Sequence, residues 1–419
     1  MASLNTQFDL IRQSATVAVA DRVTNLRAQG RAIIGLQTGD PDFVTPRPVM
    51  DAALAAMQAG ATHYGPSRGS LELRRAIADK MARVNDVRYD PENEILATHG
   101  AIHAYYCAIQ SILNPGDEVL IPDPSWATHS NMVNMLRGKA VRVPAPAENG
   151  FIPPLEAWEQ ALTPQTRAIV VNWPSNPTGA VAPREYLLEL AHIAIRHDLW
   201  IISDEVYEYL VYDGITHTCI ASLPGMKERA LVLNSLSKTY AMTGWRVGYL
   251  TAPQTVIERA LKASQNAITC LSPFIQKAAT FALSDPGVQQ AAREMREAYA
   301  QRRQLVLRLV REHGPSPVKI TPPDGAFYFF MDMRSLDIPS IEICESLLEE
   351  ASVALVPGVA FGEQGEGFVR MTIAASQAEI ETGFKAILKW AERSNEYSKF
   401  DIRKSEDRPT HIECPTSNI

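Results

Sequence analysis

Short apolar runs that alternate with helical patterns are the feature that most constrains the fold of this chain. Four apolar runs lie at Glu118–Ile121, Ala168–Asn172, Trp200–Ser203 and Ala230–Leu233. Helical patterns accompany them, for example over Leu71–Val84 and Tyr186–His197. Apolar runs without polar alternation are typical of parallel strands that are covered on both faces. The pattern therefore predicts an α/β fold with a doubly wound, mostly parallel sheet and right-handed crossovers.

The pattern changes beyond about Pro286. A long charged helical stretch leads into two shorter predicted strands, Ala326–Met331 and Gly367–Ile373, and a final amphipathic helix covers Gln377–Trp390. This predicts a smaller α+β domain formed by both termini. The predicted division is an N-terminal segment 1–45 that joins the small domain, a large domain 46–290, a small domain 291–393 and a polar tail 394–419. The tail has no periodicity, so we expect it to be disordered or draped on the surface.

Composition excludes several classes of function. The 419 residues are 46% hydrophobic, which is ample for a large core, and the net charge is -7. No basic run indicates a nucleic-acid surface, and no window approaches the roughly 20 apolar residues of a membrane span. The N-terminus has no apolar region of a secretory signal. The five cysteines lack the spacing of a disulfide framework or a zinc site. We expect a cytoplasmic protein without a metal site.

The segment Leu233–Tyr249, LNSLSKTYAMTGWRVGY, carries the richest chemistry. Lys238 follows a predicted strand and lies in a Ser/Thr/Gly loop with Ser235, Ser237 and Arg246 nearby. Hydroxyl groups and a guanidinium are suited to a phosphate group. An amine beside a phosphate-bearing aldehyde forms an imine where burial and nearby cations lower its pKa.

Two further strand ends carry candidate ligands. Asp204 ends an apolar run and precedes Tyr207 by three residues. A buried carboxylate needs a cationic partner, and a protonated pyridine nitrogen is one such partner. A helix N-cap followed by a packed tyrosine is an equally good explanation. Asn176 lies in the turn AIVVNWPSNPTG and offers an amide to a ring oxygen or to a substrate carboxylate, and turn geometry alone explains it equally well. Gly100, Ala101 and Ile102 open a helical run and would present N–H groups to an anion.

Together these segments resemble the class I and II aminotransferases, the fold-type I family of pyridoxal-phosphate enzymes. The matching positions extend from Ser14 to Ser376, and SLSKTYAMTGWRVGY, NPTG and SDEVY carry most of the resemblance. The resemblance implies pyridoxal 5'-phosphate as cofactor and a homodimer with active sites at the subunit boundary. It also implies transfer of the α-amino group of an amino acid to a 2-oxo acid by a ping-pong mechanism.

The resemblance assigns roles residue by residue. Lys238 matches the Schiff-base lysine, and Asp204 matches the partner of the pyridine nitrogen. Tyr207 and Asn176 match the ligands of the ring oxygen. The residues that match the phosphate cup are Gly100, Ala101, Ile102, Ser235, Ser237 and Arg246.

Five more positions match residues around the ring and the substrate. Trp126, in DPSWATH, matches the aromatic side chain that stacks on the ring, and His129 matches the residue that supports the aspartate. Tyr64, in THYGPSRG, resembles the tyrosine that reaches the phosphate from the neighbouring subunit. Arg370 matches the clamp for the substrate α-carboxylate, and Gly39 matches a backbone donor to the same group. Without the resemblance, Arg370 would be read as a surface charge on a strand.

One position departs from the nearest branch. The overall pattern is closest to the aspartate-aminotransferase-like branch, in which a lysine often stands in the phosphate-cup turn and helps to bind a distal carboxylate. This chain has Ile102 there, followed by His103. Aromatic, aliphatic or cationic donors are therefore open alternatives. The other interpretation is that Ile102 only packs and that another residue, for example Arg68, binds the distal group.

Two other functions compete with transamination. The same fold hosts pyridoxal-phosphate lyases and cyclases that act on amino acids by elimination, replacement or ring closure. A non-catalytic, cofactor-binding regulator is the third alternative, but the chain has no helix-turn-helix extension and keeps a full set of catalytic positions. Sequence alone does not identify the donor or the acceptor.

Overall fold

A computed structural model describes residues 4, 6–11 and 15–406 of the chain. Its centre is a seven-stranded sheet in the order β2-β8-β7-β6-β5-β3-β4. The strands are β2 (Ile95–Thr98), β3 (Glu118–Asp123), β4 (Lys139–Pro144), β5 (Thr166–Asn172), β6 (Trp200–Asp204), β7 (Ala230–Ser235) and β8 (Gly248–Thr251). Only β8 runs antiparallel to its neighbours, and the other pairs are parallel. The predicted doubly wound, mostly parallel sheet is confirmed.

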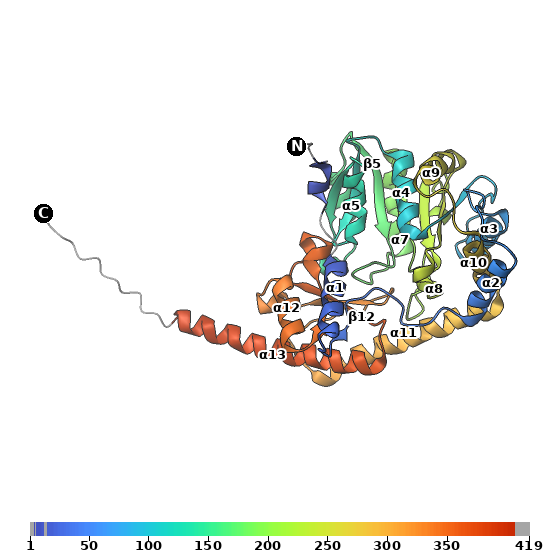
Figure 1. The fold of residues 1–419 in the computed structure, drawn as a ribbon. Helices are drawn as coiled ribbons and strands as arrows, with labels where there is room; N and C mark the ends of the chain where they lie inside the picture. Colours follow the sequence, from blue (N-terminus) through green and yellow to red (C-terminus); the bar gives the residue numbers. More distant parts are fainter. Residues whose placement is uncertain (1–3, 5, 12–14, 407–419) are drawn as a thin grey trace.

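Helices cover both faces of this sheet because alternate strand residues point to opposite sides. On one side, Val170 and Ile202 pack with residues of α4 (Gly100–Ile112) and α9 (Gln254–Ala267). On the other side, Ile169 and Ile201 pack with a second set of helices. That set comprises α2 (Arg47–Gln58), α3 (Leu71–Val84), α7 (Arg184–Arg196) and α10 (Pro273–Ser284). Figure 1 shows this layered arrangement, with α2, α3 and α10 gathered at one side. Both faces are dry, which accounts for the continuous apolar runs.

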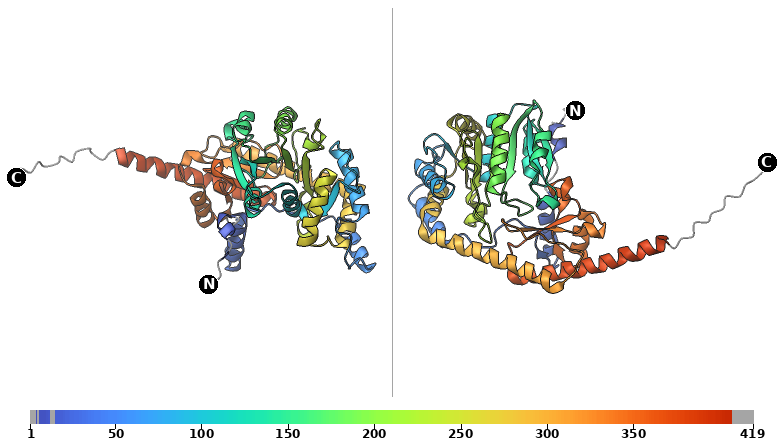
Figure 2. Two further views of the ribbon diagram at one scale, coloured as in Figure 1. Left: turned by 90° about the horizontal axis from the view of Figure 1, so that it is seen from above. Right: turned by 180° about the vertical axis from the view of Figure 1, so that it is seen from behind.

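A second core lies around a three-stranded sheet in the order β11-β12-β9. Its strands are β9 (Tyr328–Asp332), β11 (Val356–Pro357) and β12 (Phe368–Thr372), all antiparallel. The N-terminal part joins this region, because β1 (Ile34–Gly35) pairs with β10 (Val353–Ala354). The accompanying helices are α1 (Ala15–Ala28), α11 (Pro286–His313), α12 (Ser340–Glu350) and α13 (Gln377–Glu406). Figures 1 and 2 show α11 running from the α2–α10 side to this second region.

The last helix is longer than the sequence pattern predicts. We expect an amphipathic helix to Trp390 and an irregular tail from residue 394, but α13 continues to Glu406. No proline or glycine occurs between Gly383 and Pro409, so nothing in the sequence breaks the helix there. The rest of the predicted tail, 407–419, lies outside the described residues. Among the helices that the structure describes, none has the length and apolar character needed to cross a membrane.

Candidate active site

A cavity of about 320 Å³ opens where the central strands end. The last residues of three neighbouring strands, Asn172, Asp204 and Ser235, all line it. Carboxyl ends of strands in open α/β sheets are the usual place for ligands. The predicted site residues that line it are Gly39, Ala101, Ile102, Trp126, Asn176, Asp204, Tyr207, Ser235, Ser237, Lys238, Arg246 and Arg370. Side chains far apart in the sequence therefore converge on one chamber.

Lys238 lies on α8 (Leu236–Thr239), a single turn that begins directly after β7. The Ser235 hydroxyl caps this turn by accepting a hydrogen bond from the Ser237 N–H at 3.1 Å. The Lys238 ammonium donates to the Gly39 carbonyl and lies 5.7 Å from the centre of the Phe327 ring. Burial is the main cause that lowers the pKa of Lys238 to about 8. A lysine with this pKa is neutral far more often near neutral pH than an exposed lysine, as a nucleophilic amine requires.

Asp204 ends β6 and is held by neighbours on both of its oxygens. Its Oδ2 lies 3.1 Å from His129 Nε2, and its Oδ1 accepts the Val206 N–H at 3.3 Å. His129 is 1% exposed and lies on α5 (Ala127–Met135), which Trp126 precedes. The Trp126 ring meets the His129 ring edge to face, with centroids 5.3 Å apart. The carboxylate thus keeps a fixed orientation at the floor of the cavity.

The phosphate end of the predicted site is built from the N-terminus of α4 and the loop after α8. Gly100 has φ +75°, and a Cβ there would lie 2.6 Å from Arg246 Nη2. Only glycine therefore allows the guanidinium to approach this helix end so closely. Arg246 donates to the Thr243 carbonyl at 2.8 Å. Ala101 and Ile102, in the first turn of α4, line the cavity beside it, where N–H groups attract anions.

The opposite end of the cavity holds Arg370, on β12 of the smaller sheet. It is only 2% exposed, yet no acidic residue among those described forms an ion pair with it. Its Nη1 donates to Asn176 Oδ1 at 2.9 Å and its Nη2 to the Gln37 carbonyl at 2.7 Å. Its Nε has no partner in the described part of the chain. Burial lowers the pKa of this guanidinium. A buried cation with an unused donor is a binding site for a ligand carboxylate.

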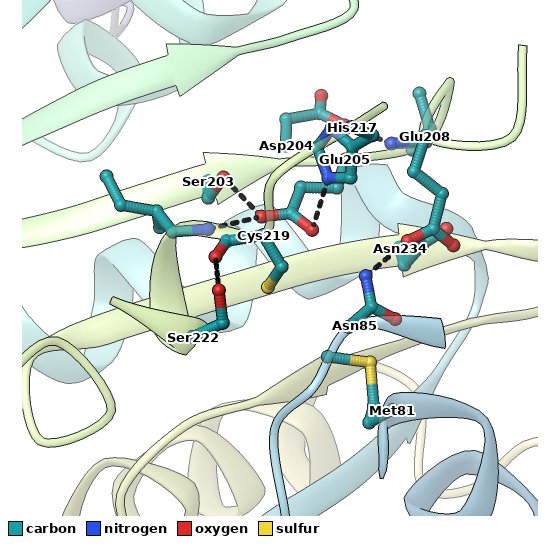
Figure 3. A network of polar contacts seen from close by, with 12 residues as sticks. Met81, Asn85, Ser203, Asp204, Glu205, Glu208, His217, Cys219, Ser222 and Asn234 are labelled. Atoms are coloured by element: carbon teal, nitrogen blue, oxygen red, sulfur yellow. Dashed lines mark hydrogen bonds and ion pairs between the residues drawn. The ribbon is translucent and has the colours of Figure 1, made fainter. Parts of the chain in front are cut away.

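A network of buried polar side chains lies next to Asp204 (Figure 3). Glu205 accepts from Ser203 Oγ at 2.8 Å and pairs with His217 Nε2 at 3.0 Å. Glu208 pairs with Lys80 and accepts from Asn85 Nδ2 at 2.7 Å. Although burial alone would raise the pKa of Glu208, Lys80 holds it below its ordinary value. Burial likewise opposes charge on His217, but Glu205 beside it raises its pKa. The network therefore pairs each of two buried glutamates with a basic side chain.

Some residues fall outside the sequence-based prediction. Tyr64 does not line the cavity and is 88% exposed. Arg68, the alternative reader of a distal group, instead donates to the Glu92 carbonyl. Further residues line the cavity that the sequence did not single out: Thr16, Thr38, Asp40, Asn172, Val206, Thr243 and Tyr328. No local sequence signal marks Tyr328, because the partner that its buried hydroxyl needs comes from a distant segment.

The residues around the cavity fit pyridoxal phosphate. A basic pocket at a helix N-terminus suits the phosphate, and a fixed carboxylate suits the ring nitrogen. Lys238, with its lowered pKa, lines the same cavity. Asn234 Nδ2 is also buried and has no partner among the described residues. The donors and charges present are therefore compatible with this cofactor.

Comparisons with known proteins agree with this arrangement. The family described as "Aminotransferase class I and II" matches residues 31–387. The "Aromatic-amino-acid aminotransferase 2" of Thermococcus litoralis is 44% identical over 355 residues, which cover 84% of this chain and 90% of that protein. The "Aspartate aminotransferase" of Pyrococcus abyssi is 41% identical over 379 residues, 90% of this chain and 96% of that one.

Solved structures extend the agreement to three dimensions. The aspartate aminotransferase of Thermus thermophilus with maleate has a TM-score of 0.88 and 38% identity, and covers 93% of this chain and 100% of its own. The aromatic aminotransferase of Pyrococcus horikoshii has a TM-score of 0.84 and 40% identity, with coverage of 88% and 99%. Transamination, rather than elimination or cyclisation, is the activity in these names. The chain therefore belongs to the class I and II aminotransferase family and is a pyridoxal-phosphate-dependent transaminase of fold type I.

Proposed function

We propose that the preferred amino donor has an uncharged side chain, aromatic or aliphatic. This proposal rests on the basic side chains around the cavity, none of which is left to bind a second carboxylate. Among the described residues, the lysines and arginines that line it are Lys238, Arg246 and Arg370, and each has a predicted role with the cofactor or the α-carboxylate. Ile102, which is 41% exposed, stands where a distal carboxylate would need a cation. Burying a second carboxylate without one costs several kcal/mol, of the order known for unpaired charges.

The roles of the chain's own residues follow from their placement. Bound pyridoxal phosphate supplies an aldehyde that condenses with amines and a ring that takes up an electron pair. We assign Arg246, Ser235, Ser237 and the first turn of α4 to the phosphate, and Asp204 to the ring nitrogen. His129 and the Val206 N–H fix the orientation of the Asp204 carboxyl group.

Substrate binding and proton transfer use the other end of the cavity. Arg370 and the backbone at Gly39 hold the α-carboxylate, which fixes Cα near Lys238. The Lys238 amine then accepts the proton that leaves Cα and returns a proton later, because its lowered pKa makes the neutral form more accessible near neutral pH than in an ordinary lysine. Trp126 limits access of water to one face of the bound groups, and Tyr207 with Asn176 holds the ring oxygen.

Ile102→Lys tests the donor class. We expect kcat/KM for aspartate to rise by about ten- to a hundredfold relative to phenylalanine. The new lysine would stabilise the buried side-chain carboxylate of aspartate by about 1.4–3 kcal/mol. Steady-state kinetics with both donors and one shared acceptor measure the ratio. Ile195→Lys, at a 41% exposed position on α7 outside the cavity, is the matched control. A wild-type enzyme that already prefers aspartate over phenylalanine would refute the proposal.

We also propose that the protein is a homodimer with shared sites. Tyr64 is exposed and lies outside its own cavity, as expected for a residue that serves a neighbouring subunit. Large apolar side chains are exposed in the same part of the chain, among them Val44 (78%) and Leu54 (49%). Exposed large apolar side chains that form a contiguous patch favour association. Sedimentation equilibrium should give twice the mass of one 46.2 kDa chain. A single-chain mass at assay concentration would contradict the dimer.

A cytoplasmic location stays a proposal as well. It is supported by the cysteines of the described residues, Cys107, Cys219, Cys270 and Cys344, which are free thiols. Cell fractionation with an antibody to the protein would decide it.

A further inference from the structure

Two tyrosines from different sheets meet hydroxyl to hydroxyl inside the cavity. Tyr207 follows β6 of the large sheet, and Tyr328 begins β9 of the small one. Their Oη atoms lie 2.8 Å apart, and either can be the donor. Tyr207 is 4% exposed and Tyr328 is 1% exposed. The contact is therefore a dry hydrogen bond that joins the two parts of the molecule at the site.

The space for the Tyr328 hydroxyl depends on Gly39. A Cβ at Gly39 would lie only 2.3 Å from Tyr328 Oη. The Tyr328 ring also lies 4.4 Å from the Arg370 guanidinium. Tyr328 thus contacts the predicted carboxylate clamp with its ring and the predicted ligand of the cofactor oxygen with its hydroxyl.

The number of hydroxyl protons determines which tyrosine donates the Tyr207–Tyr328 hydrogen bond when the cofactor is bound. A phenol carries one proton to donate and lone pairs to accept. Burial is the main cause that raises the pKa of both Tyr207 and Tyr328, so both keep their protons at neutral pH. When Tyr207 gives its only proton to the ring oxygen, it has none left for Tyr328. The bond at 2.8 Å then exists only if Tyr328 donates to Tyr207.

We propose that Tyr328 is a positioning residue that acts through Tyr207. By donating to the Tyr207 oxygen, it holds that phenol toward the cavity and strengthens it as a donor, since hydrogen bonds in a chain polarise one another. The proposal rests on the assignment of Tyr207 to the cofactor oxygen. Because Tyr328 belongs to the small sheet, the strength of this donor depends on how closely the two sheets approach.

A double-mutant cycle on the holoenzyme tests the proposal. Tyr207→Phe, Tyr328→Phe and the double variant are titrated by the visible absorbance of the bound cofactor. When the hydrogen-bond donor is weaker, the ring oxygen becomes more basic. The proton that it shares with the neighbouring nitrogen of the lysine adduct is then lost at higher pH, so the midpoint of the absorbance titration rises. We expect Tyr328→Phe to raise the midpoint by about 0.3–1 pH unit, the range given by one neutral hydrogen bond. In the Tyr207→Phe background, the same change should add nothing.

Tyr212→Phe is the matched control. Tyr212 is equally buried, and its hydroxyl donates to the Ala326 carbonyl outside the cavity. It should leave the midpoint unchanged. Since phenylalanine keeps the ring beside Arg370, KM for the donor should change less than twofold in Tyr328→Phe, while kcat falls about three- to tenfold.

The outcomes separate the two assignments. Equal shifts from Tyr328→Phe with and without Tyr207 would overturn the proposed action through Tyr207. The absence of any shift from Tyr328→Phe in both the wild-type and the Tyr207→Phe backgrounds would overturn it as well. If Tyr207→Phe alone leaves the midpoint unchanged, the assignment of Tyr207 to the ring oxygen fails first, and the role of Tyr328 fails with it.

Discussion

Lys238→Ala is expected to lower kcat/KM by about 10⁴-fold or more, the upper end of what general acid–base catalysis contributes. The variant loses both the amine that carries the cofactor and the base that accepts the Cα proton. Cofactor is expected to bind still, because the contacts at Arg246 and Asp204 remain, but without the visible absorbance of the lysine adduct. Spectra and steady-state rates of the purified variant measure both effects.

Two controls make the Lys238 experiment specific. Lys277→Ala removes an exposed lysine that pairs with Glu72 and should leave both readouts unchanged. Lys238→Arg keeps a positive charge but cannot form an imine or shed its proton near neutral pH, so it should be as inactive as alanine. Full turnover by Lys238→Ala would refute the assignment, whatever the fold of the variant.

Arg370→Leu is expected to lower kcat/KM for amino acids by about 30- to 5,000-fold, as for loss of a buried charge partner worth 2–5 kcal/mol. No described acid pairs with Arg370, so the substitution leaves no opposite charge unpaired in the interior. The loss should fall mainly on substrates with an α-carboxylate. Half-reaction rates with an amino acid and with the corresponding amine measure this difference.

Arg334→Leu is the matched control for this experiment. Arg334 lies in the same region of the chain, but it is half exposed and pairs with Asp332 and Glu148. Its loss should change the rates with amino acids less than twofold, as is typical of surface charges. If Arg370→Leu slowed the amine as much as the amino acid, the clamp assignment would be wrong.

The sequence predicts the large sheet well because its signals are local. The run Ala168–Asn172 lies within β5, and the predicted helix Leu71–Val84 coincides with α3. Strand-end residues such as Asp204 and Ser235 reach the cavity because parallel strands end at one edge. The domain boundaries at 45, 290 and 393 stay predictions, although the two separate cores are compatible with them.

The features that the sequence does not predict depend on contacts between distant segments of the chain. Nothing local in the sequence places the Tyr328 hydroxyl against Tyr207, 121 positions earlier. The same holds for Lys80. Its place in an amphipathic helical pattern predicts an exposed side chain, but it is buried against Glu208. The extension of α13 to Glu406 was missed because a polar stretch without breakers looks the same whether it is helical or irregular.

The network of buried polar side chains next to Asp204 constrains how this chain can diverge. Lys80 pairs with Glu208, and His217 pairs with Glu205, in the interior of the protein, so the loss of any one of the four leaves its partner unpaired. Breaking such a pair costs about 3–5 kcal/mol, a large part of the roughly 5–15 kcal/mol that holds a domain folded. Descendants of this sequence should therefore keep all four residues or exchange acid and base together in a single evolutionary step.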